Sequence, residues 1–173
     1  MMSMMKVIVD GGVSRGGKVG VGKTLFVKKV LKVLSSSDET YFPTMGVELQ
    51  SDMKHSMRFW DLGSKFRGMG YGYYKDAKAL IVVIDVTNRS SMKEAVGICS
   101  TFRKMNGEDA PIALVFNKVD VDLRHWQCTQ EEINGIRGRG VRVFYHSNAY
   151  DKYDASDDIL NYLKTSVMSR RLR

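Results

Sequence analysis

Apolar and polar positions follow two alternating patterns along this chain. Short, mostly continuous apolar runs predict strands at 6–9, 57–61, 79–86, 112–117 and 141–145. Apolar residues at helical spacing predict helices at 24–34, 91–105, 129–137 and 156–168. Continuous apolar runs are typical of strands that are covered on both faces, as in a parallel sheet. The alternation therefore predicts an α/β fold, with helices on both faces of a mostly parallel central sheet.

Length and composition indicate a single domain over residues 1–173. Of its 173 residues, 43% are hydrophobic, which is enough to bury a core without disulfides or a structural metal. Within this domain we expect an irregular glycine-rich insertion at 10–17 and a basic C-terminal tail at 169–173. The polar segment 35–44 is expected to form a loop.

The cysteine content and the chain ends bear on location. Cys99 and Cys128 show neither a disulfide framework nor metal-ligand spacing, which favours an intracellular compartment. We expect the cytoplasm, with the nucleus as a second location. The N-terminal apolar stretch is too short for a signal peptide or a membrane span. Met2 excludes N-myristoylation, and no terminal cysteine offers a prenylation site, so no lipid anchor is expected. The net charge of +8 is spread along the predicted helices, so we expect no specific nucleic-acid partner.

Residues 17–24 match the pattern G-x-x-x-x-G-K-[ST] of a phosphate-binding loop. Glycines allow backbone N–H groups to surround phosphate oxygens, and the helix that follows directs its positive end at the same anion. The lysine of the pattern would contact the β and γ phosphates, and the threonine hydroxyl would bind Mg²⁺. The nucleotide-binding candidates here are Gly17, Lys18, Val19, Gly20, Val21, Gly22, Lys23 and Thr24.

A second motif, Asn117-Lys118-Val119-Asp120, directly follows a predicted strand. A carboxylate accepts two parallel hydrogen bonds. Guanine presents an N–H and an NH₂ group on one edge, whereas adenine does not. Asp120 can therefore select guanine, and the order of the two motifs favours a guanine nucleotide.

Two further residues complete a candidate Mg²⁺ site with Thr24. Asp61 ends a predicted strand in the sequence Trp60-Asp61-Leu62-Gly63, where a carboxylate can hold Mg²⁺ through water. Thr44 lies in a polar loop, where its hydroxyl could join the metal shell when the γ-phosphate is present. The sequence thus predicts Thr24, Thr44 and Asp61 as the metal ligands.

These residues resemble the Ras superfamily of small GTPases over nearly the whole chain, with Ran-like sequences nearest and Rab-like sequences second. The resemblance is carried by residues 22–29, 44–48, 84–91 and 117–121. It implies a P-loop small-GTPase fold, GTP or GDP with Mg²⁺, and a monomer that binds exchange factors, activating proteins and effectors. It also implies that the backbone N–H of Ala149 meets the guanine oxygen, with Asn148 and Tyr150 in the serine and lysine places of the family's S-A-K motif.

Departures from the family pattern concern hydrolysis. The second switch of the family usually has the sequence D-x-x-G-Q, in which glutamine orients the attacking water. This chain has Asp61-Leu62-Gly63-Ser64-Lys65, about two residues are missing before Tyr73, and no glutamine lies nearby. Ser64 or Lys65 takes the glutamine's place, and neither offers its paired donor and acceptor. The candidate catalytic residues are Thr44, Gly63, Ser64 and Lys65.

Other departures concern the phosphate loop and the hairpin. Val19 stands where Ras and Ran have glycine and would crowd the γ-phosphate and an incoming arginine. About six extra residues separate Val9 from Gly17, so the segment either bulges outward or the first strand restarts nearer Lys18. The hairpin at 47–60 is shorter than usual for the family.

Three functions remain open from the sequence. The first is a Mg²⁺-dependent GTP/GDP switch with slow hydrolysis, in Ran- or Rab-like trafficking or transport signalling. The second is a docking module, GTP-bound or nucleotide-free, that binds partners without cycling. The third is a P-loop kinase with an arginine-rich lid at 135–142, which Asp120 in its N-K-x-D context argues against.

Overall fold

The computed structural model describes residues 4–12, 20–33, 44–63, 71–136, 138 and 140–172. These residues form a six-stranded sheet in the order β2-β3-β1-β4-β5-β6. Neighbouring strands are parallel except β2 and β3, which form an antiparallel hairpin. The strands are β1 (Met5–Gly11), β2 (Val47–Asp52), β3 (Met57–Leu62), β4 (Ala79–Asp85), β5 (Ile112–Asn117) and β6 (Val141–Tyr145). The predicted mostly parallel sheet and the hairpin are both confirmed.

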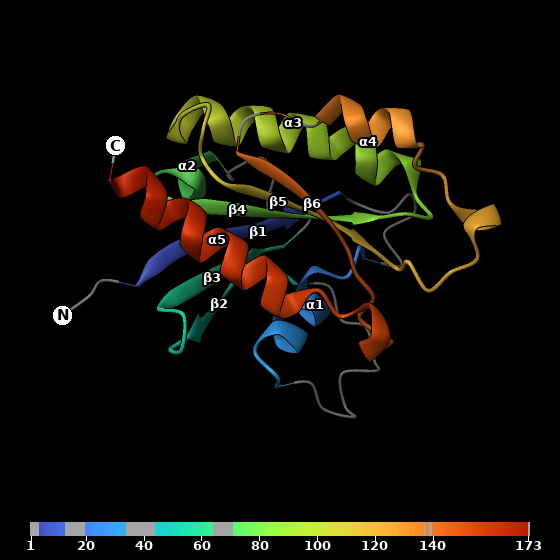
Figure 1. Ribbon diagram of the computed structural model, residues 1–173, viewed down its shortest axis with the longest axis horizontal. Helices are drawn as coiled ribbons and strands as arrows, with labels where there is room; N and C mark the ends of the chain where they lie inside the picture. Colours follow the sequence, from blue (N-terminus) through green and yellow to red (C-terminus); the bar gives the residue numbers. More distant parts are fainter. Residues whose placement is uncertain are drawn as a thin grey trace.

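Helices cover both faces of this sheet, as predicted (Figure 1). α1 (Lys23–Val30) and α5 (Ser156–Arg171) pack on one face. α2 (Tyr71–Tyr74), α3 (Arg89–Asn106) and α4 (Gln130–Ile136) lie on the other. Two short 3-10 helices, η3 (Leu123–His125) and η4 (Asp151–Tyr153), lie in the loops that follow β5 and β6.

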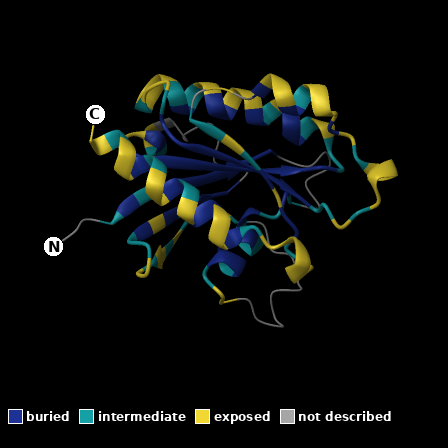
Figure 2. Cartoon of the chain, in the orientation of Figure 1, coloured by how far each residue is buried: buried dark blue, intermediate teal, exposed yellow. Residues whose placement is uncertain are grey.

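The core lies in two layers on either side of the central strands. β4 and β5 are buried along their whole length, which explains their uninterrupted apolar sequences (Figure 2). Phe26 of α1 and Leu163 of α5 fill the layer on one face, and Phe102 of α3 fills the other. Tyr74 at the end of α2 is buried against this second layer.

The ends of the helices differ from the sequence prediction for local reasons. α1 ends at Val30 rather than at residue 34, because Lys32 adopts a left-handed conformation with φ 57°. The N–H of Lys32 then donates to the oxygen of Lys29, and that of Val33 to Lys28, which is a Schellman motif. At the other end of the chain α5 continues to Arg171, so most of the predicted basic tail is helical.

The first strand also extends further than predicted. Asp10 and Gly11, the first two residues of the segment 10–17, belong to β1. A Cβ at Gly12 would overlap the backbone of Ser91 in α3, which explains the glycine at the point where the strand ends. The chain is described again from Gly20, and Lys18, where a restart of the strand was considered, lies outside the described residues.

Candidate functional site

The candidate residues gather at the carboxyl ends of the parallel strands. Asp61 lies near the end of β3, Asn117 ends β5, and Ser147 follows β6. The start of α1 lies beside them, because the chain enters this helix after leaving the carboxyl end of β1 (Figure 1). Crevices at this edge of an open α/β sheet are the usual place for a ligand.

Gly22 forms the turn into α1, with φ 94°. The side-chain amide of Asn117 donates to the oxygen of Val21 at 3.0 Å, and that of Asn148 donates to the oxygen of Gly22 at 3.1 Å. A Cβ at Gly22 would overlap the Nδ2 atom of Asn117 and lie 2.7 Å from that of Asn148. The turn therefore requires glycine both for its conformation and for the approach of the two amides.

Thr24, Thr44 and Asp61 meet in space although they are far apart in sequence. The Oγ1 atom of Thr24 donates to Oδ2 of Asp61 at 2.5 Å and lies 2.9 Å from Oγ1 of Thr44. Two hydroxyls and a carboxylate are hard oxygen donors of the kind that Mg²⁺ prefers. The structure thus brings together the three side chains that the sequence assigned to one metal ion.

The carboxylate of Asp61 is fully buried. Burial raises its pKa to about 6, although the hydrogen bond from Thr24 and the nearby charge of Lys23 act in the opposite direction. Among the described residues, its Oδ1 atom is buried without a hydrogen-bond partner. An unpaired buried carboxylate oxygen is costly, so these residues fit a bound cation or its water.

Two other residues border this group. Lys23 is buried at the first position of α1, near enough to Asp61 to affect its pKa. The N–H of Gly63 donates to the oxygen of Gly46 at 2.7 Å, and a Cβ at Gly63 would overlap the oxygen of Thr44. Gly63 therefore allows the segment after β3 to lie directly against the segment before β2.

Lys118 of the second motif is paired with a buried carboxylate. Its Nζ atom donates to Oδ2 of Asp85, at the end of β4, at 2.6 Å. The other oxygen of Asp85 accepts from the N–H and the hydroxyl of Thr87. The backbone of Lys118 is left-handed, with φ 68°. Asp85 was not predicted as a site residue, since it lies inside the apolar run 79–86 and in neither the phosphate-loop pattern nor N-K-x-D.

Asp120 is exposed and is held by Ser147, whose hydroxyl donates to Oδ1 at 2.5 Å. The same hydroxyl oxygen accepts from the N–H groups of Ala149 at 3.1 Å and Tyr150 at 3.2 Å. The sequence analysis missed Ser147. Its only signal was its position in Ser147-Asn148-Ala149, directly before Asn148, the residue that was aligned with the serine of S-A-K.

His146 supports the same loop from the core. It packs edge-to-face on Phe26, and its Nδ1 atom accepts from the N–H of Ala155 at 3.1 Å. Nε2 therefore carries the proton and donates to Oδ1 of Asn148 at 3.0 Å. Burial lowers the pKa of His146, so the neutral form is favoured.

Several predicted residues cannot be placed. Those that lie outside the described residues are Gly17, Lys18, Val19, Ser64 and Lys65.

Arg142 of the kinase hypothesis lies over the rings of Phe144 and Tyr162, near the amino end of β6 and away from the site. In the described part of the chain no cluster of three or more His, Cys, Asp or Glu side chains could hold a metal, and no helix could cross a membrane.

Comparison with known families adds one finding. The family model described as Ras family matches residues 16–166, which is most of the chain. The match includes Thr24, Thr44, Asp61, Asp120 and the loop around Ser147.

Proposed function

This chain belongs to the Ras family of small GTPases, and on that basis we propose that it is a Mg²⁺-dependent guanine-nucleotide switch with slow GTP hydrolysis. The observation that carries the proposal is the contact of Thr24 with both Thr44 and Asp61 at the start of the phosphate-loop helix. These residues would hold Mg²⁺, which neutralises charge on the β and γ phosphates when bound.

The base-binding part of the proposal is supported by the loop after β6. The contact of Ser147 with Asp120 favours aligning Ser147 with the serine of S-A-K, instead of Asn148. The backbone N–H of Asn148 then takes the place first given to Ala149 and would meet the guanine oxygen. Asp120, which is exposed, would accept hydrogen bonds from the N–H and NH₂ groups of the base.

Slow hydrolysis is inferred from the sequence. Ser64 and Lys65 replace the glutamine that orients water, and Val19 adds a branched side chain beside the γ-phosphate. An activating arginine contributes about 10³ to 10⁵ in rate, so a residue that blocks its approach has a large effect. The same substitutions support a second candidate function, a GTP-bound docking module that does not cycle.

The proposed partners follow from the family. Ras-family proteins interact with regulators and effectors, and we extend to this chain exchange factors, activating proteins and effectors that bind around Thr44 and the segment after Asp61. The Ran- and Rab-like residues in 84–91 and 117–121 favour a role in transport or trafficking.

The experiment that tests the proposal is identification of the nucleotide that acid releases from freshly purified protein. GDP supports a cycling switch, and intact GTP supports the docking module. The protein should release its nucleotide faster when EDTA removes Mg²⁺. An empty site that takes up no GTP in the presence of Mg²⁺ would overturn both candidate functions.

A further inference from the structure

Helix α1 carries a buried lysine that the phosphate-loop motif does not include. Lys29 is only 7% exposed, and its Nζ atom donates to the backbone oxygens of Ser147 at 3.1 Å and Asn148 at 3.4 Å. It also lies 3.2 Å from Oδ1 of Asp151. All three acceptors belong to the loop between β6 and α5, more than a hundred residues later in the chain.

Of the three contacts of Lys29, the two with carbonyl oxygens are the ones that hold this loop. A buried ammonium group is unfavourable unless its protons are hydrogen-bonded, so Lys29 needs these acceptors. The side chain of Asp151 is 98% exposed, and water screens its attraction for the ammonium group. The backbone of Ser147 is therefore held at its oxygen by Lys29 and at its N–H by the oxygen of Tyr153, at 3.1 Å in both cases.

Ser147 transmits this constraint to the base-binding carboxylate. Its oxygen accepts from Lys29, while its hydroxyl donates to Oδ1 of Asp120 at 2.5 Å. The path from Lys29 to Asp120 thus passes through one residue. Because α1 begins at Lys23, the helix that starts at the phosphate loop also supports the loop that holds Asp120.

We propose that Lys29 is a positioning residue for guanine recognition, which acts by holding Ser147 so that Asp120 keeps the orientation needed for the base. This inference rests on the proposed guanine-nucleotide binding and extends it to a residue outside the known motifs. It requires that loss of Lys29 weaken GDP binding, in which Asp120 contacts the 2-amino group, more than the binding of a nucleotide that lacks this group.

Inosine diphosphate isolates that contact. Hypoxanthine lacks the 2-amino group that guanine donates to the carboxylate, but the phosphates and the 6-oxygen are unchanged. The ratio of GDP affinity to IDP affinity therefore measures the hydrogen bond between Asp120 and the amino group. A variant that only destabilises the fold lowers both affinities together and leaves this ratio unchanged.

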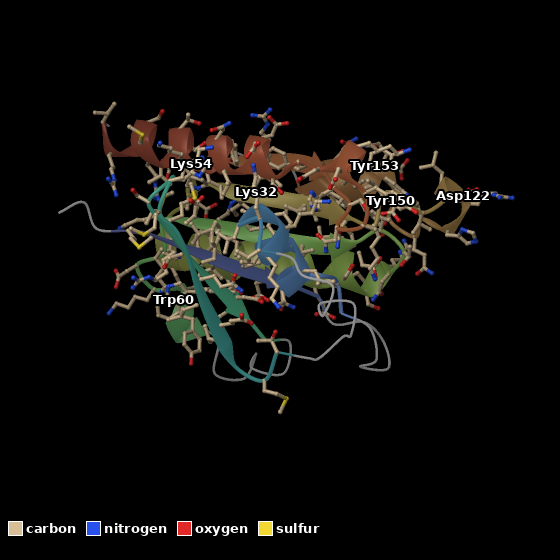
Figure 3. The ribbon with its side chains drawn as sticks, turned by 90° about the horizontal axis from the view of Figure 1, so that it is seen from below. Lys32, Lys54, Trp60, Asp122, Tyr150 and Tyr153 are labelled. Carbon is tan, nitrogen blue, oxygen red and sulfur yellow. The ribbon has the colours of Figure 1, made fainter. Side chains whose placement is uncertain are left out.

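The experiment compares GDP and IDP affinity of the full chain with Mg²⁺ for the unmodified protein, Lys29→Gln and Lys32→Gln. Lys32 lies one turn further along, is exposed at the end of α1 and provides the matched loss of charge (Figure 3). Lys29→Gln is expected to weaken GDP binding by about tenfold and to reduce the GDP/IDP ratio by about threefold, since a charge-assisted buried hydrogen bond is lost. Lys32→Gln and Asp151→Asn are expected to leave the ratio unchanged.

Two further variants keep the test decisive. Lys29→Arg retains the cation and is expected to preserve most of the ratio. Ser147→Ala removes the link without touching Lys29, so it should reduce the ratio as Lys29→Gln does, and the double variant should reduce it no further. If Lys29→Gln does not fold, Ser147→Ala alone carries the test, and a GDP/IDP ratio in Ser147→Ala equal to that of the unmodified protein would overturn the inference.

The outcomes separate this inference from the function on which it rests. Unmodified protein that binds neither GDP nor IDP would overturn the proposed function and the role of Lys29 together. If the unmodified protein binds GDP and Lys29→Gln has the same GDP/IDP ratio as Lys32→Gln, only the role of Lys29 would be overturned.

Discussion

The side-chain amide of Asn117 donates a hydrogen bond to the backbone oxygen of Val21 at 3.0 Å. It joins the segment that would recognise the base directly to the segment that would surround the phosphates. Its other atom, Oδ1, is buried without a partner among the described residues. The protein itself thus holds the two halves of the proposed nucleotide site together. A substitution in either half can be tested on its own.

Loss of the phosphate-loop lysine should abolish nucleotide binding. Lys23→Ala removes a cation expected to contact two phosphates, so GDP affinity should fall by about a hundredfold or more. Fluorescent-nucleotide titration measures the change, with Lys32→Ala as a control of equal charge at an exposed position. Unchanged affinity in Lys23→Ala would rule out the phosphate-loop assignment.

Replacement of Asp120, the proposed base-binding carboxylate, should change specificity. Asp120→Asn exchanges an acceptor for a donor, which suits xanthine, whose 2-oxygen replaces the amino group of guanine. We expect the variant to bind xanthosine diphosphate more tightly than GDP, with competition between the two nucleotides as the measurement. Equal binding of ATP and GTP by unmodified protein would contradict the role of Asp120.

The buried histidine should make stability depend on pH. The pKa of His146 is lowered by burial, so the folded protein binds fewer protons there than the unfolded chain. Its stabilising contribution is then complete above about pH 6.5 and is lost as the pH falls through the lowered pKa. His146→Asn should show a weaker fall in the melting temperature between pH 7 and pH 5.

The exposed His125 supplies the control for this pH effect. His125→Asn is the matched substitution at an exposed position, and we expect it to keep the pH dependence of the unmodified protein. If His146→Asn and the unmodified protein respond to pH in the same way, the neutral buried form of His146 does not contribute.

A methyl group at Gly63 should separate two neighbouring segments. In Gly63→Ala the new Cβ would overlap the oxygen of Thr44 and lie 2.8 Å from that of Gly46. We expect a loss of about 1–3 kcal/mol in the free energy of unfolding, measured with urea. Gly97→Ala, in α3 with no atom within 4 Å of its Cβ, should instead raise stability by up to about 1 kcal/mol.

Restoring the family residues should accelerate hydrolysis. Val19→Gly combined with Lys65→Gln supplies the missing amide and removes the branched side chain that the family alignment predicts to lie beside the γ-phosphate. We expect single-turnover GTP hydrolysis to rise by about a hundredfold, the lower end of what a positioned side chain contributes to proton transfer. Combining Val19→Gly with Ser64→Gln tests the other alignment. No gain from either would identify the shortened second switch as the cause.

The sequence by itself determined the architecture and most of the local chemistry. Uninterrupted apolar runs at 79–86 and 112–117 predicted strands buried on both faces, and β4 and β5 occupy that place. Helical spacing predicted a helix at 129–137, and Thr129 and Glu132, which have capping-box spacing, form the reciprocal hydrogen bonds at the start of α4. Such features depend on residues close together in sequence, so a linear pattern is sufficient to find them.

The ends of the helices were predicted less well, because apolar spacing does not show where a helix stops. Apolar spacing continues past Val30, but the left-handed turn at Lys32 ends α1, and lysine gives no sign of that conformation in the sequence. α5, in contrast, is longer than predicted. It continues past Met168 because basic side chains are favourable in the last turn of a helix.

Only the tertiary structure decided which side chains support the site. Thr24, Thr44 and Asp61 were predicted from motifs, but their contact exists because α1 and the carboxyl end of β3 lie side by side. The roles of Lys29 and Ser147 were not predicted from the sequence. Their partners are distant in sequence, and a contact between distant residues depends on how the elements pack, which local patterns of polarity do not encode.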